Sequence, residues 1–306
     1  MAFWQKQAGD DGWTAVVFGT DRIAVADVER RDGARPRVRA CDSFAREGGE
    51  VDALKRLGKA RRIGRRSTTL LWHGQYQLLQ VDAPDNATEL AHDELCEAIR
   101  WRVKEMIDFP VETAGVDVID IPPVGSHGRQ LWVVAASREA LQSRVRLFQD
   151  AKIPLQAIDI PELAQRNIAT LFEEPERGLA VVAFDSKGGR LTISYRGELY
   201  MVRYLDVGGP ELAGAQAEAL FERVLLDIQR TLDNFDRNYG AILLSRLLVG
   251  PLPGGEKFVA YLVDNLSLPV ASADLADVLD IDATPGLAET QAQYDHWRAL
   301  GAALRD

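Results

Sequence analysis

Glycine and aspartate occur together in two short turns of the chain, residues 18–21 (FGTD) and residues 185–189 (DSKGG). A turn that contains glycine can bring its backbone N–H groups close to a phosphate, because glycine has no side chain in the way. An aspartate at such a turn can help to hold Mg²⁺. The same residue types are also required by an ordinary hairpin turn. Phosphate binding and plain turn formation are therefore the two interpretations of these segments.

Each turn lies in a segment of similar design. Residues 15–31 read AVVFGTDRIAVADVERR, and residues 180–196 read AVVAFDSKGGRLTISYR. In both, a short apolar strand leads through the turn into an alternating strand, which reverses at a second turn that contains glycine. A hairpin that opens both halves of a chain predicts two similar domains, and ligands often bind in the cleft of such an arrangement.

The remaining elements follow from apolar periodicity and from glycine and proline breakers. In the first half we expect one bent strand or two short ones over 68–81, and further strands and helices at 85–107 (helix), 114–121 (strand), 130–136 (strand), 138–151 (helix), 155–160 (strand) and 162–172 (helix). In the second half we expect strands at 179–185, 190–196, 199–205, 246–250 and 269–271, with helices at 212–238, 254–266 and 294–304.

This order of elements predicts a duplicated α/β fold, in which each half is a three-stranded antiparallel set followed by α/β crossovers. The acidic, proline-containing segment 173–177 is the natural boundary between the halves. We therefore expect a first domain over 1–174 and a second over 175–306. The terminal helix, about 290–306, is then free to pack back on the first domain.

Composition excludes several classes of protein. The 306 residues are 46% hydrophobic, which is enough for two buried cores. Basic residues number 36 against 46 acidic ones, and a net charge of −10 argues against general nucleic-acid binding. No apolar run approaches the roughly 20 residues of a membrane span, and no signal peptide is recognisable at the N-terminus. We expect a cytoplasmic protein that reaches a membrane only through partners.

The sequence predicts neither a metal centre of its own nor a set of catalytic residues. Cys41 and Cys96 form no CxxC or other metal-binding spacing, and the four histidines share no helical face. No Ser–His–Asp or Cys–His arrangement is indicated, which leaves the glycine turns as the segments with potential chemistry.

Three further segments resemble a known family. Residues 99–121 (IRWRVKEMIDFPVETAGVDVIDI) are similar to a segment of PilM-type and MshI-type pilus biogenesis proteins, where a WxxKxxIDFP helix leads into a strand. Residues 224–237 (VLLDIQRTLDNFDR) and 299–304 (ALGAAL) resemble other parts of these proteins. The resemblance spans nearly the whole chain. The lack of a DxGxxxxK-like opening makes the MshI type, of mannose-sensitive haemagglutinin (MSHA) pili, a better match than PilM.

The resemblance implies an actin-like, ribonuclease H-like fold and a place in the inner-membrane assembly platform of a type IV pilus. Relatives of the PilM type bind the cytosolic N-terminal segment of a bitopic platform protein. The expected partner is thus a PilN-like or MshJ-like membrane protein, and the expected location is the cytoplasmic side of the inner membrane. A working ATP-binding actin-like ATPase and a component similar to the cytosolic domain of a type II secretion platform are the alternatives. A filament-forming actin homologue is a third.

The family's nucleotide cleft can be compared with this chain one segment at a time. The resemblance implies ATP and Mg²⁺ contacts from three groups of residues: Gly19, Thr20 and Asp21; Asp185, Lys187, Gly188 and Gly189; and Gly250, Gly254 and Gly255. Phe18 stands near the acidic position of the first group, and Lys187 stands where small residues are usual. Pro251 replaces the second glycine of the adenosine motif and removes a donor. Asp185 remains as a magnesium ligand, should the ion bind. We expect a pseudo-ATPase without turnover, and residual ATP binding stays open.

The partner surface is expected beside the helix that ends in the IDFP segment. On the resemblance, the partner peptide lies in a groove of the first domain, near this helix and the strand before it. Trp101, Ile107 and Phe109 are the candidate contacts. Replacement of Phe109 by Asp is expected to weaken partner binding and to leave folding intact.

Overall fold

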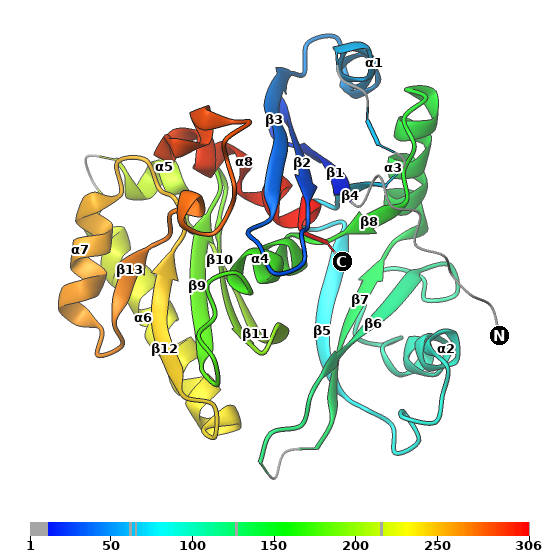
Figure 1. The fold of residues 1–306 in the computed structure, drawn as a ribbon. Helices are drawn as coiled ribbons and strands as arrows, with labels where there is room; N and C mark the ends of the chain where they lie inside the picture. The colour runs from blue at the N-terminus through cyan, green and yellow to red at the C-terminus, as the bar shows by residue number, and fades with distance from the viewer. Residues whose placement is uncertain (1–11, 61–62, 65, 126–127, 215–216, 306) are drawn as a thin grey trace. The chain divides into compact units, whose positions relative to one another are not determined.

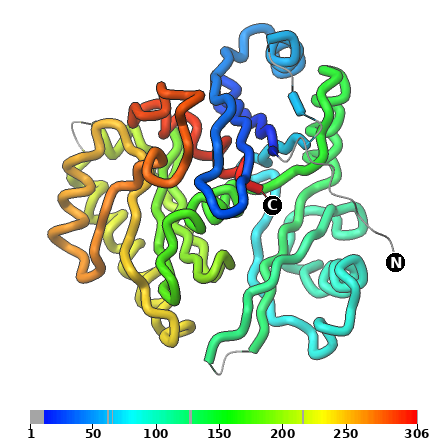
Figure 2. The backbone as a smooth tube through the Cα atoms, in the orientation of Figure 1, coloured from blue at the N-terminus to red at the C-terminus, as the bar shows by residue number. Residues whose placement is uncertain are grey.

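The computed structural model describes residues 12–60, 63–64, 66–125, 128–214 and 217–305. The chain forms two compact units, and neither unit is continuous in sequence. The first unit comprises residues 1–70, 147–168 and 274–306, and the second comprises residues 71–146 and 169–273. Figure 2 lets the reader follow the backbone from one unit into the other and back.

The first unit contains a five-stranded sheet with the order β3–β2–β1–β4–β8 (Figure 1). Its strands are β1 (Gly12–Phe18), β2 (Arg22–Glu29), β3 (Arg37–Ala45), β4 (Ser67–Leu70) and β8 (Ala157–Asp159). The hairpin strands β1, β2 and β3 pair antiparallel, whereas β4 runs parallel to β1 and β8 runs parallel to β4. Every residue of β1 is buried, as expected for a central strand that is covered on both faces.

Helices complete the first unit. They include α1 (Glu50–Ala60), most of α4 (Pro161–Ala169) and α8 (Thr290–Ala303), with short 3-10 turns η1 (Leu275–Asp277) and η2 (Pro285–Ala288). α3 (Arg138–Asp150) enters the unit at its C-terminal end, and Oγ of Ser137 caps its other end by accepting from the N–H of Ala140. α8 packs against β1, β2 and β4. The last helix of the chain therefore completes the core of the sheet that begins the chain.

The second unit contains a sheet of the same design, with the order β11–β10–β9–β12–β13. Its strands are β9 (Gly178–Phe184), β10 (Gly189–Tyr195), β11 (Glu198–Leu205), β12 (Leu244–Val249) and β13 (Val270–Ser272). Again the first three pair antiparallel, and the other two run parallel to β9. The order and directions repeat those of the first sheet strand by strand. The predicted duplicated α/β fold is thus confirmed.

The helices of this sheet differ in one respect from the sequence prediction. α5 (Gly209–Leu212) and α6 (Glu218–Tyr239) stand in place of one helix over 212–238, and α7 (Glu256–Asn265) follows β12. α5 is a single closed turn. The N–H of Gly208 donates to the Glu211 carboxylate, and the carbonyl of Gly208 accepts from the N–H of Leu212. α6 buries the predicted apolar stripe, which includes Phe221, Val224, Leu225, Ile228 and Phe235.

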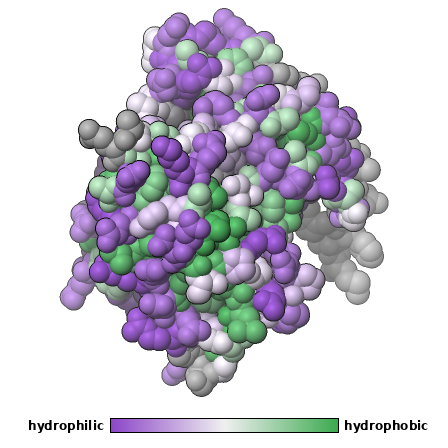
Figure 3. Space-filling view, turned by 90° about the vertical axis from the view of Figure 1, so that its left-hand side faces the viewer, coloured by the Kyte–Doolittle hydropathy of each residue, from purple (hydrophilic) through white to green (hydrophobic). Residues whose placement is uncertain are grey.

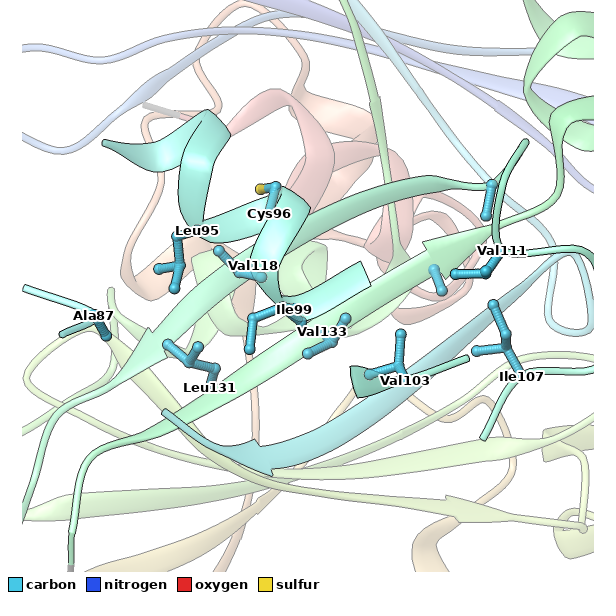
Figure 4. Close-up of a cluster of buried hydrophobic side chains, with 12 residues drawn as sticks. Ala87, Leu95, Cys96, Ile99, Val103, Ile107, Val111, Val118, Leu131 and Val133 are labelled. Carbon is cyan, nitrogen blue, oxygen red and sulfur yellow. The ribbon is translucent and has the colours of Figure 1, made fainter. Parts of the chain in front are cut away.

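A three-stranded antiparallel sheet with the order β5–β7–β6 also belongs to the second unit. It consists of β5 (Tyr76–Asp82), β6 (Gly115–Ile121) and β7 (Gln130–Ala136), and α2 (His92–Arg102) packs on β6. Figure 4 shows the buried cluster between this helix and the sheet, in which Ile99, Val103, Leu131 and Val133 are fully covered.

α2 is shorter at both ends than the predicted helix over 85–107. Residues 84–89 form turns, and the helix starts only where the Glu94 carboxylate caps the N–H of Ala91. At the other end, Val103 leaves the helical conformation with a ψ of 2°, and the N–H of Met106 donates to the Val103 carbonyl. This turn directs Ile107 and Val111 into the buried cluster. Burial of these side chains accounts for the end of the helix at Arg102, which lies eight residues before Pro110.

The compact units differ from the two continuous domains expected from the sequence. The expected boundary, 174/175, does separate the strands of the two five-stranded sheets, since it lies between β8 and β9. The three-stranded sheet, however, groups with the later strands. Nε1 of Trp132 on β7 donates to the Leu199 carbonyl on β11 at 2.8 Å, and Tyr239 at the end of α6 contacts Gln80 on β5 at 2.9 Å.

One face of the surface is drawn by hydropathy in Figure 3. On the face drawn in Figure 3, hydrophilic side chains predominate, and hydrophobic ones lie in small patches between them. Within the described part of the chain, no helix combines the length and the apolar character that crossing a bilayer requires.

Candidate functional site

The glycine turn of the first unit is held by an arginine that the sequence did not single out. The N–H of Gly19 closes the β1–β2 turn on the Arg22 carbonyl at 2.7 Å. The Arg46 guanidinium donates to the carbonyls of Gly19 and Thr20 at 2.6 and 3.1 Å, and it also pairs with Glu50. The turn is therefore fixed through its carbonyl groups.

Phe18, which precedes this turn, is a core residue. It is buried, and its ring meets the ring of Phe148 edge-to-face at 6.3 Å between centroids. Thr20 and Asp21 are exposed at the tip of the turn. The position that the resemblance assigns to an acidic group is thus part of the hydrophobic packing of the first unit.

The aspartate of the second turn binds its own loop. Asp185 Oδ1 accepts from the backbone N–H groups of Lys187 and Gly188 at 2.8 and 3.1 Å. Asp185 Oδ2 lies 3.3 Å from Nη1 of Arg190, whose side chain is only 6% exposed. Backbone N–H groups of this loop are the donors that a phosphate would require. Two of them already donate to a carboxylate.

An aromatic side chain packs against Gly188 of the same loop. A Cβ at Gly188 would overlap the Tyr204 ring, with 2.7 Å to Cζ. His73 stacks on this ring at 4.1 Å between centroids, and the Arg190 guanidinium lies 5.9 Å from the centre of the ring. Burial, and secondarily Asp185, raises the pKa of Tyr204. Glycine at 188 is explained by the close approach of Tyr204, without a ligand.

Lys187 extends toward an aromatic ring. Its Nζ lies 5.8 Å from the centre of the Trp72 ring, a cation–π distance. A lysine at this position could pair with a phosphate or with the carboxylate of Asp185. In the structure Asp185 pairs with Arg190 instead. Sequence reasoning missed Arg190 because it assigned this residue to the expected strand 190–196 and not to the turn.

The glycines of the expected adenosine motif also have structural roles. Gly250 directly follows β12, and its N–H donates to the Val182 carbonyl at 2.7 Å. A Cβ here would lie 2.8 Å from that of Ala183. Gly254 has a φ of +71°, a left-handed conformation that favours glycine, and Gly255 caps α7.

The structure brings part of the predicted site together. β9 and β12 are parallel neighbours, so residues 185–189 and Gly250 lie at the same edge of the second sheet, beyond the carboxyl ends of both strands. Such edges are where open α/β sheets bind ligands. Gly19, Thr20 and Asp21 belong to the first unit.

A surface pocket lies beside the C-terminal half of α2. Its volume is about 430 Å³, and it is lined by Glu97, Arg100, Trp101, Glu112, Thr113, Ala114 and Arg138. Trp101 is 56% exposed, which is unusual for its size. Nζ of Lys104 lies 5.6 Å from the centre of its ring and 3.5 Å from Glu112. The lining of the pocket includes an exposed aromatic ring and two arginines, and both residue types are enriched at protein interfaces.

The other two candidate contacts are less accessible. Ile107 is 9% exposed and belongs to the buried cluster of Figure 4. Phe109 is partly buried and packs against the same cluster. Asp108 between them links the loop to β5, because its N–H donates to Oε1 of Gln77 at 2.8 Å. Of the three residues that the sequence singled out, Trp101 is thus the one whose side chain is largely exposed.

Three potential metal ligands meet at the other end of α2. Nε2 of His92 lies 2.8 Å from Oδ1 of Asp117 and 3.6 Å from Sγ of Cys96. Burial raises the pKa of the Cys96 thiol. Sequence reasoning missed this group because Asp117 comes from β6, although the spacing of His92 and Cys96 by four residues was a signal. His127 lies outside the described residues.

Comparison with solved structures identifies the fold. The chain is similar to a structure described as the PilM–PilN type IV pilus biogenesis complex, with 18% identity, 97% of this chain and 99% of that chain covered, and a TM-score of 0.77. It also matches the cytoplasmic domain of EpsL, an inner-membrane component of the type II secretion system of Vibrio cholerae (14% identity, 78% and 81% covered, TM-score 0.48). A protein with an actin-like ATPase fold from Bacteroides thetaiotaomicron matches at 10% identity, with 94% and 100% covered and a TM-score of 0.49.

No protein-family model matches the chain, and no curated protein matches it. At 18% identity, the likeness over 97% of the chain concerns the fold. Together with the sheet order repeated in both units, it identifies the chain as having the actin-like fold in its PilM-like form.

Proposed function

We propose that this chain is a scaffold protein of a type IV pilus assembly platform, which binds the cytosolic segment of a PilN-like or MshJ-like inner-membrane protein. The observation that carries the proposal is the fold likeness to the PilM–PilN complex along nearly the entire length of both chains. On this proposal the protein is cytoplasmic and is recruited to the inner membrane by its partner. The lack of a DxGxxxxK-like opening favours a pilus of the MSHA type.

The proposed binding surface is the pocket beside α2. Exposed tryptophan side chains are frequent energetic centres of interfaces, because they bury a large area at little cost in conformational entropy. Trp101 has its ring exposed, whereas its neighbour Arg100 is fixed to the Ala114 carbonyl at 2.6 Å and to Glu97 at 3.0 Å. A bound peptide would therefore contact a surface that Arg100 holds in place, with the Trp101 ring as its one large apolar contact.

The chain is further proposed to be a pseudo-ATPase. Support comes from the second unit, where the Asp185 carboxylate accepts hydrogen bonds from two loop N–H groups and pairs with Arg190. An Asp engaged in this way is poorly disposed to organise Mg²⁺ and water.

The test is a binding titration. A fluorescently labelled synthetic peptide with the sequence of the cytosolic N-terminal segment of the PilN-like protein from the same genome is titrated with the purified chain, and its anisotropy is recorded. Wild type should bind. Trp101→Ala should bind at least about tenfold more weakly, which is a modest hot-spot loss. Leu243→Ala, at a residue that is 64% exposed in the α6–β12 connection, should bind as wild type does.

The outcomes separate the function from its site. No binding by the wild-type chain would contradict the proposed function. Binding that is unchanged in Trp101→Ala would retain the function and remove the pocket beside α2 as its site. An equal loss in both variants would point to a general effect on folding, which circular dichroism of each variant checks.

A further inference from the structure

His92, Cys96 and Asp117 form a cluster that the proposed function does not use. His92 and Cys96 are four residues apart on α2, so their side chains lie on one face of the helix, one turn apart. Asp117 lies on β6, the strand against which α2 packs. Cys96 sits at the edge of the buried cluster, as Figure 4 shows. The group of His92, Cys96 and Asp117 therefore lies at the surface, where α2 meets the sheet.

The three side chains direct one ligand atom each toward a common point. Nε2 of His92 is 2.8 Å from Oδ1 of Asp117 and 3.6 Å from Sγ of Cys96, and Sγ and Oδ1 are 4.0 Å apart. Both neighbours of the imidazole approach the same nitrogen. A catalytic relay would need the thiol and the carboxylate at opposite nitrogens of the ring. Convergence on one nitrogen is instead the arrangement of ligands around an ion.

The separations suit a tetrahedral ion. Zinc bonds of about 2.0–2.3 Å to nitrogen, oxygen and sulfur at tetrahedral angles place the ligand atoms about 3.4–3.6 Å apart. Two of the three observed distances, 3.6 and 4.0 Å, are within a few tenths of an ångström of this range. The His92–Asp117 distance of 2.8 Å must open by roughly half an ångström. Both side chains are more than half exposed, 61% and 69%, so solvent leaves them room to move.

The ligand set selects the metal, and the backbone supports the carboxylate. One imidazole nitrogen, one thiolate and one carboxylate oxygen form a borderline-soft set that favours Zn²⁺ over Mg²⁺ or Ca²⁺. The N–H of Val118 donates to Oδ1 of Asp117 at 2.9 Å and thereby orients the carboxylate.

We propose that His92, Cys96 and Asp117 form a zinc-binding site with a fourth coordination position open to solvent. Binding joins the first turn of α2 to β6, and α2 carries Trp101 at its other end. The inference rests on the geometry of this cluster and is independent of the proposed function.

The test uses the tag-free full-length chain, stripped with a chelator and reloaded. Zinc affinity is measured by competition with a chromophoric chelator, and Co²⁺ is used as a spectroscopic probe. One equivalent of Zn²⁺ should bind, and Co²⁺ should give a thiolate charge-transfer band. Cys96→Ser should lose the band, and His92→Ala and Asp117→Asn should bind zinc at least about tenfold more weakly. Cys41→Ser is the matched control, because Cys41 lies on β3 of the first unit, and it should retain both properties.

Zinc should also raise the midpoint of thermal unfolding of the wild type and of Cys41→Ser, because an ion that binds only the folded state stabilises it. It should not raise the midpoint of Cys96→Ser. The absence of a cobalt–thiolate band in the wild type would overturn the proposal, as would zinc binding that Cys96→Ser retains unchanged.

Discussion

At the scale of single residues, Asp185 illustrates how a motif can persist while its groups serve the fold. The carboxylate caps two N–H groups of its own loop and neutralises a buried arginine. Each interaction is one that hairpins and cores use without any ligand. The family resemblance singled out this aspartate, and the structure shows that it contacts its own loop and Arg190.

Replacement of Asp185 by Ala should destabilise the chain by about 2 kcal/mol, because two loop N–H groups lose their acceptor and Arg190 loses a partner. Asp185→Asn retains a side-chain oxygen that accepts from the loop, so it should lower the stability less than Asp185→Ala does. Asp206→Ala is the control, since Asp206 is 82% exposed and its closest approach to Arg223 is 3.7 Å. It should change stability by less than about 0.5 kcal/mol. Urea unfolding of the three variants measures these differences, and equal stability of all three would contradict the structural role of Asp185.

At the scale of elements, the helix that ends the chain completes the unit that begins it. Small residues allow α8 to approach its neighbours closely: Ala299, Gly301, Ala302 and Ala303 are all buried. Gly301 meets α4 directly, because a Cβ there would overlap the Ala164 carbonyl oxygen and lie 2.7 Å from its carbon. The contact is between two backbones and leaves no side chain that could move aside.

Gly301→Ala should therefore destabilise the first unit by about 2 kcal/mol or more. Alanine normally favours a helix over glycine by about 1 kcal/mol, but overlap with backbone atoms outweighs this gain. Gly286→Ala in η2 is the matched control, since no atom lies within 4 Å of the Cβ it would add. Thermal unfolding of the two variants should separate them clearly, and a Gly301→Ala protein as stable as Gly286→Ala would refute the close approach.

The end of α8 also brings a charge to a buried carboxyl group. Arg305 Nη1 donates to Asp159 Oδ2 at the end of β8 at 2.6 Å, and its guanidinium lies 5.7 Å from the centre of the Trp13 ring. Burial raises the pKa of Asp159, while Arg305 and Arg166 act in the opposite direction. A carboxyl whose pKa is raised on folding stabilises the protein most below the pKa of the unfolded chain, near 3.8, and loses this contribution as pH rises through the folded value.

Arg305→Gln removes the larger of the two opposing charges, so the pKa of Asp159 should rise further. At neutral pH the variant should be about 2 kcal/mol less stable than wild type, which is below the figure for a fully buried pair because Arg305 is 38% exposed. The difference should shrink as pH falls toward 4. Urea unfolding at several pH values checks this, with Arg203→Gln, at a surface pair with Asp227, as control. A difference that does not depend on pH would assign the loss to the Trp13 contact instead.

At the scale of the whole molecule, the two units repeat one sheet design, yet their turns differ. In the first unit an arginine holds the carbonyls of the turn, and in the second a carboxylate holds its N–H groups. A nucleotide would have to displace the carboxylate of Asp185 before it could accept from the second turn.

Calorimetric titration with ATP and Mg²⁺ should accordingly give no micromolar binding, and Asp185→Asn should behave like wild type. Asn preserves the acceptor that the loop needs and removes the charge that a magnesium ion needs, so folding and binding are tested separately. Micromolar binding by the wild type that Asp185→Asn abolishes would instead establish a working nucleotide site and support the ATPase alternative.

The sequence by itself was sufficient for those features that depend on local pattern. Alternation and apolar periodicity located nearly all strands and the stripe of α6, and the repeated hairpins indicated the duplication. The lengths of α2 and of the 212–238 helix were wrong, because burial of Ile107 and a closed turn at Glu211 end helices that propensity would continue.

Only the tertiary structure decided which distant groups meet. α8 joins β1 and β2 across nearly the full length of the chain, Arg190 and Tyr204 enclose the Asp185 turn, and Asp117 approaches His92 and Cys96. The spacing of His92 and Cys96 indicates only that these two residues share one face of α2. The meeting of groups from separate elements has no signature in residue spacing. Residue spacing determines the face of one element on which a side chain lies, whereas the packing of elements determines which side chain lies opposite it.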